Sequence, residues 1–326
     1  TGMTEQNAST ATFEQKISPI LEQFEVQRKK CLKKWFTCMF IIGGLGALFC
    51  INISQRSAQP VQPIFIVVVV SGLLGVGILY LITNSYKKGY KNEVVRAVIQ
   101  AYKPGLNYHP ESYVSEGKFQ SSKLFLEGID RYKGEDHISG ICGKTDFEFS
   151  ELHAQYKTTS SDSKGRTSTR WHTIFKGIFF IADFHKDFRT HTVVLPDTAE
   201  KLFGFLGKKL QGMNLTRGEL IKLEDPEFER EFCVYGDDQI EARYILSPGL
   251  MRRILSYRSK FGAKMHLAFL KSRVYIALST DKNHFEPKVF TPVNDLSQVQ
   301  VFRNDLDMII DIIEDLNLNT RLWSKE

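Results

Sequence analysis

Two uninterrupted apolar runs near the N-terminus constrain this chain more than any other feature. Residues 35–53 (WFTCMFIIGGLGALFCINI) and 64–83 (IFIVVVVSGLLGVGILYLIT) contain no charged side chain. At about 1.5 Å of rise per residue, either run forms a helix long enough to cross a hydrocarbon layer of roughly 30 Å. Because a helix satisfies its own backbone polar groups in lipid, the two runs predict a transmembrane helical hairpin.

Basic side chains flank this hairpin almost entirely on one side. Five precede the first run and four follow the second, whereas the link between the runs holds only Arg56. The nine flanking residues are Arg28, Lys29, Lys30, Lys33, Lys34, Lys87, Lys88, Lys91 and Arg96. Since basic flanks stay on the cytoplasmic side, we expect a multi-pass membrane protein with its N-terminus and C-terminal domain in the cytoplasm.

Small residues inside the runs bear on how the helices pack. Gly43 and Ala47 stand four residues apart in the first run, and Ser71 and Gly75 do so in the second. This spacing lets helices approach closely, so we expect it to bring the two helices of the hairpin together. Use of the same faces between two copies, which would make a homo-oligomer, stays open. Neither run holds an ionisable residue, so the hairpin is expected to be an anchor and not an ion path.

The texture of the sequence divides the chain into four parts. We expect a cytosolic N-terminal helix at 1–34, the hairpin at 35–83, a juxtamembrane helix at 84–104 and a cytosolic domain at 105–326. In the last part, short alternating strands are mixed with helices at hairpin-like spacing, without repeated strand–helix–strand units. That pattern predicts a mixed, mainly antiparallel α+β fold.

Local signals predict the ends and faces of several elements. Ser18-Pro19 resembles a helix N-cap with proline at the first helical position, and Ser247-Pro248 repeats the pattern. Residues 197–200 have the spacing of a capping box and predict a further helix. Residues 240–244 alternate like a strand. A closing helix is expected to turn its acidic residues to water: Asp305, Asp311, Glu314 and Asp315.

Charge and cysteine content exclude some classes of protein. The net charge is +6, but part of it comes from the basic cluster ahead of the first run, and the remaining residues are close to neutral. Such a body is a poor candidate for binding nucleic acid by charge. The five cysteines show no C-x-x-C spacing, which fits a reducing compartment without disulfides.

Patterns that carry chemistry are few. Asp183, His185 and Asp187 would share one face of a strand, and two carboxylates with an imidazole are a donor set for a divalent metal. The competing interpretation is the water-facing side of a strand whose phenylalanines enter the core. Gly143-Lys144-Thr145 ends like a phosphate-binding loop, but Ile138 occupies the position where that loop needs glycine. The catalytic residues are unknown, and no cofactor is expected.

A polar tract interrupts the strands of the body. Residues 157–170 (KTTSSDSKGRTSTR) are rich in hydroxyl and basic side chains. Polar stretches of this kind between two strands predict an extended hairpin loop at the surface. Phospholipid headgroups or a partner protein are possible contacts, and the role of the tract stays open.

Three segments resemble one family. FEFSELHA, FKGIFFIADFHKDF with TVVLPD, and LEDPEFEREFCVYGDDQIEARYILSPGLMRRI are similar to the bacterial proteins grouped as domain of unknown function 3137. The resemblance spans roughly residues 85–325 and implies a pair of N-terminal membrane helices ahead of a cytosolic domain. It implies no reaction, cofactor or catalytic residue, so no role is carried over onto this sequence.

These features favour a non-enzymatic function. We expect a membrane-anchored cytosolic interaction or scaffold module of the bacterial inner membrane, in contact with the lipid bilayer and a protein partner. The alternative is a membrane-surface hydrolase or metal-dependent enzyme that uses Asp183, His185 and Asp187.

Overall fold

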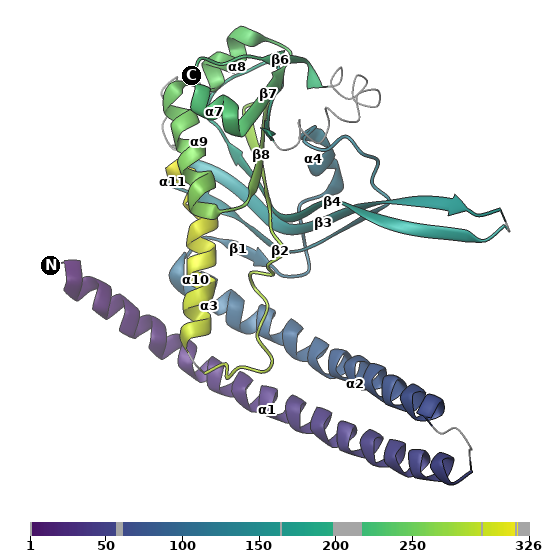
Figure 1. Ribbon diagram of the computed structural model, residues 1–326. Helices are drawn as coiled ribbons and strands as arrows, with labels where there is room; N and C mark the ends of the chain where they lie inside the picture. The colour runs from purple at the N-terminus through teal and green to yellow at the C-terminus, as the bar shows by residue number, and fades with distance from the viewer. Residues whose placement is uncertain are drawn as a thin grey trace. The chain divides into compact units, whose positions relative to one another are not determined.

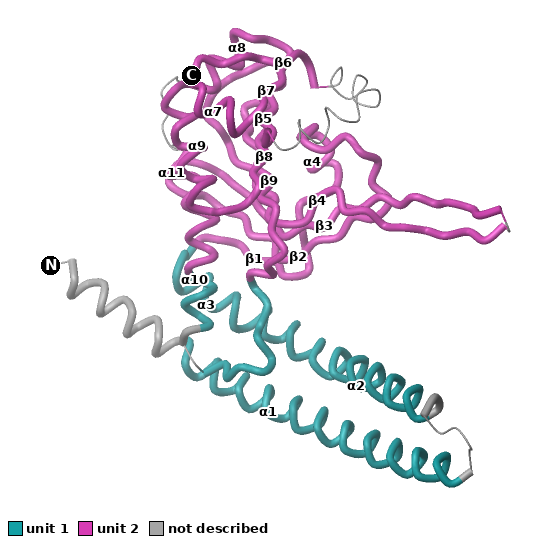
Figure 2. Tube along the Cα trace, viewed as in Figure 1, with its two compact units in different colours: residues 1–104, 285–303 teal, residues 105–284, 304–326 magenta. Residues whose placement is uncertain are grey.

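The chain forms two compact units. The computed structural model describes six stretches of residues: 2–56, 61–163, 165–197, 217–294, 296–316 and 318. The first unit combines residues 1–104 with 285–303, and the second combines residues 105–284 with 304–326 (Figure 2). We call them the helical unit and the sheet unit. The helix expected to follow residues 197–200 lies outside the described residues.

The helical unit contains both apolar runs. Its elements are α1 (Gly2–Arg56), α2 (Val61–Tyr90), the π-helical turn η1 (Lys91–Val95) and α3 (Arg96–Tyr102). Both runs are helical, as predicted, and both helices are long and apolar enough to cross a membrane. The predicted start at Ser18-Pro19 is wrong, because α1 runs continuously from Gly2 with Pro19 inside it. A proline removes only one backbone donor, and the other hydrogen bonds of so long a helix continue through it.

Helices α1 and α2 lie side by side (Figure 1). A side chain at Gly75 would overlap Met39, and one at Gly46 would place its Cβ 3.4 Å from Ser71 Oγ. Ser71 and Gly75 therefore lie at the contact between the two helices. Gly43 and Ala47 are exposed, and nothing lies within 4 Å of a Cβ built on Gly43.

The sheet unit is built on a nine-stranded sheet, counted over the described residues, in the order β1-β2-β3-β4-β9-β8-β5-β7-β6. Its neighbouring strands pair antiparallel. The strands are β1 (Asn107–His109), β2 (Arg131–Cys142), β3 (Thr145–Ser161), β4 (Thr167–Asp183), β5 (Thr192–Pro196), β6 (Glu219–Ile221), β7 (Phe232–Gly236), β8 (Lys264–Leu270) and β9 (Arg273–Ser279). The predicted α+β class is confirmed.

Six further helices are described, of which α10 runs from the helical unit into the sheet unit. They are α4 (Glu116–Ser121), α7 (Pro226–Glu231), α8 (Gln239–Ile245), α9 (Pro248–Phe261), α10 (Leu296–Ile310) and α11 (Ile312–Asp315). Alternate residues of the central strands enter a core of aromatic side chains, in which Phe119 of α4 contacts Phe175 and Phe179 of β4. Apolar burial of this kind is the main favourable term in folding.

Three local predictions change in the structure. Residues 240–244 form helix α8 and not a strand, because the Asp238 carboxylate accepts hydrogen bonds from Ile240 N (2.7 Å) and Glu241 N (3.1 Å) and so caps a helix. The tract 157–170 is mostly strand, since β3 and β4 stay paired to Ser161 and Thr167. Asp305 is buried and does not face water.

Gly177 of β4 provides a test of the sheet. Its φ of +146° is a conformation that side-chain-bearing residues rarely adopt, and a Cβ there would overlap the Leu278 carbonyl oxygen of β9. We expect Gly177→Ala to lower the free energy of unfolding by about 2 kcal/mol or more. Thermal unfolding of the detergent-solubilised chain, followed by circular dichroism, measures the loss. Gly117→Ala, at an exposed position of helix α4 where nothing lies within 4 Å of the added Cβ, should cost nothing. Equal stability of the two variants would contradict the close approach.

Candidate functional site

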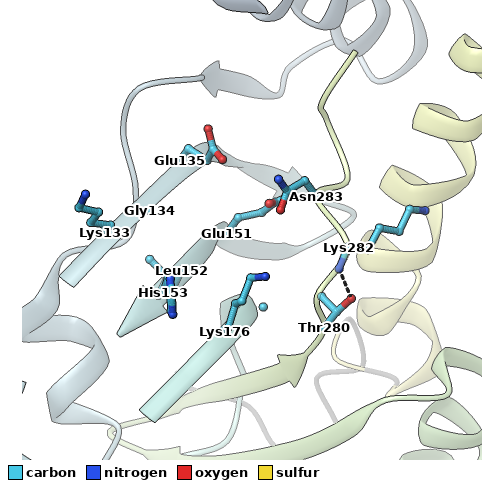
Figure 3. Close-up of a pocket in the computed structure, with 11 residues that line it drawn as sticks. Lys133, Gly134, Glu135, Glu151, Leu152, His153, Lys176, Thr280, Lys282 and Asn283 are labelled. Carbon is cyan, nitrogen blue, oxygen red and sulfur yellow. Dashed lines mark hydrogen bonds between the residues drawn. The ribbon is translucent and has the colours of Figure 1, made fainter. Parts of the chain in front are cut away.

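A polar pocket in the sheet unit is the candidate site (Figure 3). Its volume is about 340 Å³, and it lies where β2, β3 and β4 meet the segment that follows β9. The lining residues are Lys133, Gly134, Glu135, Glu151, Leu152, His153, Lys176, Gly177, Thr280, Lys282 and Asn283. Four separate stretches of sequence therefore contribute to one cavity.

Irregular backbone shapes the walls of this pocket. Between Glu135 and Ile138 the pairing of β2 with β3 shifts register, and Asp136 there has a φ of +58°. A Cβ on Gly134 would lie 2.6 Å from the Glu151 carbonyl oxygen, so the strands approach closely at that point. Glycine inside a strand marks such bulges and close approaches.

The polar groups of the pocket carry both signs of charge. Lys133, Lys176 and Lys282 line it together with Glu135 and Glu151. In Figure 3 these ammonium and carboxylate groups come from different strands and from the segment after β9. This set can form hydrogen bonds and ion pairs with a small polar ligand.

His153 is the imidazole of the pocket. Its Nε2 lies 3.2 Å from Thr173 Oγ1. Burial lowers the pKa of His153, and the nearby charges of Lys176 and Arg131 lower it further. The ring is therefore neutral at pH 7, where it can accept or donate a hydrogen bond but carries no charge.

Three carboxylates meet at the bulge. Within the described residues, Glu135, Asp136 and Glu151 form the group whose oxygens all lie within 4.8 Å of one another, as ligands of a cation would. Protein donors already engage two of them: Tyr108 Oη donates to Asp136 Oδ1 (2.5 Å), and His284 N donates to Glu151 Oε1 (2.7 Å). Burial and the Asp136 charge raise the pKa of Tyr108, which keeps it a donor. Through these hydrogen bonds, the carboxylates hold the backbone of the bulge in place.

The predicted metal residues occupy a turn. Strand β4 ends at Asp183, and His185 has a φ of +52°, so the expectation of one strand face is wrong. Asp183 Oδ1 accepts from His185 N (3.0 Å), and Asp183 Oδ2 lies 3.2 Å from His185 Nδ1. Asp187 instead accepts from Ser272 Oγ at 2.9 Å. Asp183 and His185 are brought together, and Asp187 is held by the β8–β9 turn.

The predicted basic flanks fall into two groups. Lys29, Lys30, Lys33, Lys34 and Lys88 are exposed, and Lys29 Nζ also lies 3.5 Å from Glu25 Oε1. The other four make contacts within the helical unit: Arg28 with Glu25, Lys87 and Lys91 with Glu286, and Arg96 with Asn92.

Glu286 is the long-range partner that sequence analysis missed. Its carboxylate lies 2.9 Å from Lys87 Nζ and 3.0 Å from Lys91 Nζ. Burial alone would raise the pKa of Glu286, but the two ammonium groups outweigh it and hold the pKa below its ordinary value. No periodicity in residues 280–295 predicts such a contact, because it depends on a turn of chain far from α2 in sequence.

Asp305 fixes the wall of the pocket that follows β9. Its Oδ1 accepts from Lys282 Nζ (2.6 Å), and its Oδ2 lies 3.2 Å from His284 Nδ1. Burial would raise the pKa of Asp305, but His284 and Lys282 hold the pKa below its ordinary value of 3.8. The carboxylate that was expected to face water therefore ties α10 to the pocket.

We expect Asp305→Asn to lower the free energy of unfolding by about 1–3 kcal/mol, because buried His284 loses the carboxylate that lies 3.2 Å from its Nδ1. Thermal unfolding in detergent measures the change. Asp311→Asn, which removes an acceptor of Lys260 at the surface (3.2 Å), should cost less than about 1 kcal/mol.

The pH dependence of this contribution has a defined sign. Because the folded pKa of Asp305 is lowered, its stabilisation is present above pH 3.8 and is lost as the pH falls through the folded pKa. The gap between the wild-type chain and Asp305→Asn should close in that range. A gap that persists or widens in acid would contradict the ion pair.

Comparisons with known proteins give one family match, and it lies in the C-terminal half of the chain. A family model described as "Protein of unknown function (DUF3137)" matches residues 173–318. No curated protein matches the chain. A solved structure, that of the mycobacterial trehalose monomycolate transport factor A (TtfA), is similar at 8% sequence identity over 64% of this chain and 88% of that chain. Its TM-score of 0.28 is too low to establish a shared fold. The match to this family model covers residues 173–318, and the family is the one that the sequence resembles.

Proposed function

We propose that this chain is a membrane-anchored interaction module of the bacterial inner membrane. The hairpin of α1 and α2 spans the bilayer, and the sheet unit lies in the cytoplasm, where it holds a protein partner near the membrane. The exposure of the two apolar helices carries this proposal. In their most apolar 18-residue windows, 0% and 6% of the residues are buried. A core helix of a soluble protein would be enclosed, so lipid is the solvent that suits these surfaces.

The exposed lysines support the orientation. Lys29, Lys30, Lys33 and Lys34 stand on solvent-facing positions of α1, directly ahead of the first apolar run. Ammonium groups at this level attract the anionic headgroups of the cytoplasmic leaflet. Basic residues next to a span also favour retention of that flank in the cytoplasm.

The observed geometry favours binding over catalysis. Asp187 contacts Ser272 and does not converge with Asp183 and His185 on one point. The pocket presents ion-pairing groups, several of which already contact protein partners. We therefore assign the sheet unit to recognition.

The long arm of β3 and β4 is the proposed contact for the partner. Strand β2 accompanies β3 as far as Gln155, and β9 accompanies β4 from Gly177 onward. Beyond these points β3 and β4 pair only with each other among the described strands, out to Ser161 and Thr167, and project from the sheet (Figure 1). Side chains from residue 157 to the tip are exposed where described, so the arm contributes little to the core. A binding role explains why so long a ribbon is built.

Membrane insertion is tested by fractionation and reporters. The full chain should stay in the membrane pellet during alkaline washing and should dissolve in detergent. A C-terminal fluorescent reporter should be active in the cytoplasm, whereas an alkaline phosphatase placed in the link 54–63 should be active outside. A chain that washes off, or reporters with the reverse activities, would contradict the proposal.

The arm is tested by shortening it. Replacing residues 158–170 with Asn-Gly joins Lys157 to Trp171, a directly paired position, through a two-residue turn. We expect the thermal midpoint to stay unchanged, because no buried side chain is lost. A photoreactive residue at Thr159 of the full-length chain should crosslink a defined protein in cells, and the same residue at exposed Gln120 should not. Equal crosslinking at both positions, or normal recovery of the partner by the shortened chain, would count against the arm.

A further inference from the structure

Residues 285–294, which we call the strap, belong to the helical unit although they follow the last strand of the sheet unit (Figure 2). The strap begins at Phe285, which is buried, and continues into Glu286, which pairs with Lys87 and Lys91. These two lysines lie one to two helical turns beyond the end of the second apolar run. The strap thus enters the helical unit outside the membrane-spanning segments.

From there the strap runs along α1 toward the first apolar run and then turns back. Three contacts trace its path in chain order: Val289 O to Arg28 Nη1 at 3.1 Å, the Phe290 ring to the Trp35 ring at 5.9 Å between centroids, and Val293 N to Glu25 Oε2 at 2.9 Å. Along α1, seven residues separate Arg28 from Trp35, which corresponds to about 10 Å. Phe290 is therefore the residue of the strap that lies farthest along α1 toward the first apolar run, level with the first residue of that run.

A turn fixes the tip of the strap. Thr291 N donates to Lys288 O at 3.1 Å, which places Val289 and Phe290 at the centre of the turn. Gln298 of α10 is buried and donates through Nε2 to Pro292 O at 2.7 Å. A tip braced in this way presents Phe290 with little conformational freedom to lose on binding.

One buried ion pair holds both legs of the strap. Arg28 Nε and Nη2 donate to the two oxygens of Glu25 at 2.8 and 2.7 Å, and both side chains are buried. Arg28 donates a hydrogen bond to the Val289 carbonyl, before the tip of the strap. Glu25 accepts one from Val293 N, after the tip. Bidentate pairs of this kind set geometry as well as adding energy.

The tip itself is amphipathic. Phe290 is 62% exposed, and neighbouring Lys288 is exposed as well. Beside them, Trp35 donates through Nε1 to Gly75 O at 3.1 Å, so its ring is held where the apolar run starts. Aromatic rings with lysines at the same level are typical of the boundary between headgroups and acyl chains.

We propose that the strap is a third membrane contact, which does not span the bilayer but seats Phe290 among the upper acyl chains beside Trp35. The inference rests on the proposed function, because it takes the two apolar runs to lie in lipid. Lys288 then meets the headgroups, and the side of the helical unit that carries the strap faces the cytoplasmic leaflet.

Quenching of single tryptophans by brominated lipid tests this contact. In the full chain, Trp35, Trp171 and Trp323 are first replaced by Phe. A single tryptophan is then introduced into this chain by one of three changes: Phe290→Trp, Phe36→Trp or Val301→Trp. Phe36 and Val301 are also exposed positions of the helical unit, the first at the start of the apolar run and the second on α10. Each chain is placed in nanodiscs of phosphatidylglycerol and phosphatidylcholine, with or without bromine high on the acyl chains.

We expect the emission of Phe290→Trp to fall by at least half as large a fraction as that of Phe36→Trp, and the emission of Val301→Trp to stay unchanged. Quenching at Phe36→Trp with none at Phe290→Trp would overturn the strap contact while leaving the anchor intact. Absence of quenching at both positions would overturn the anchor and the strap together. These outcomes separate the two proposals.

The ion pair of Glu25 and Arg28 provides a second measurement. Adding Glu25→Gln to the Phe290→Trp chain removes the charge that holds Arg28 and Val293 N. Quenching at position 290 should then fall by at least one third, whereas quenching in a Phe36→Trp chain that carries the same change should not. Unchanged quenching at position 290 would contradict the role of the ion pair in seating the tip.

Discussion

The buried pair of Glu25 and Arg28 joins parts of the chain that are more than 260 residues apart. Both partners stand on one helix at a spacing of three residues, so α1 sets their geometry without help from the strap. What the strap adds is a backbone carbonyl and a backbone amide, which satisfy groups that would otherwise be buried without partners. Loss of either charge would leave the other uncompensated in a buried place, which is the costly way to disrupt a salt bridge.

Carboxylates also hold irregular chain through ion pairs elsewhere in both units. Asp305 receives Lys282 and His284 in the sheet unit, just as Glu286 receives Lys87 and Lys91 in the helical unit. In each case a carboxylate with a lowered pKa fixes an irregular segment to a helix. The chain from residue 280 to 294 has no regular secondary structure to hold it, so these ion pairs and the turn at its tip define its path.

The sequence predicts those features that depend on local patterns. The two apolar runs and the cap at Ser247-Pro248 arise from neighbouring residues, and both features are present. Residues 240–244 were misassigned because their alternation is short, and the capping carboxylate of Asp238 decides the helix. Proximity in the fold could not be predicted. The pocket takes residues from four stretches, and the glycines inside strands, Gly134 in β2 and Gly177 in β4, are its visible signal in the sequence.

The discontinuous make-up of the helical unit has a consequence for biosynthesis. The ribosome completes α1 and α2 early, but Val289 and Val293, which contact Arg28 and Glu25, follow more than 260 residues later. A product truncated before residue 285 would therefore keep the Glu25–Arg28 pair but would lack the backbone groups that Val289 and Val293 supply. Completion of the helical unit therefore requires that the intervening strands have been translated.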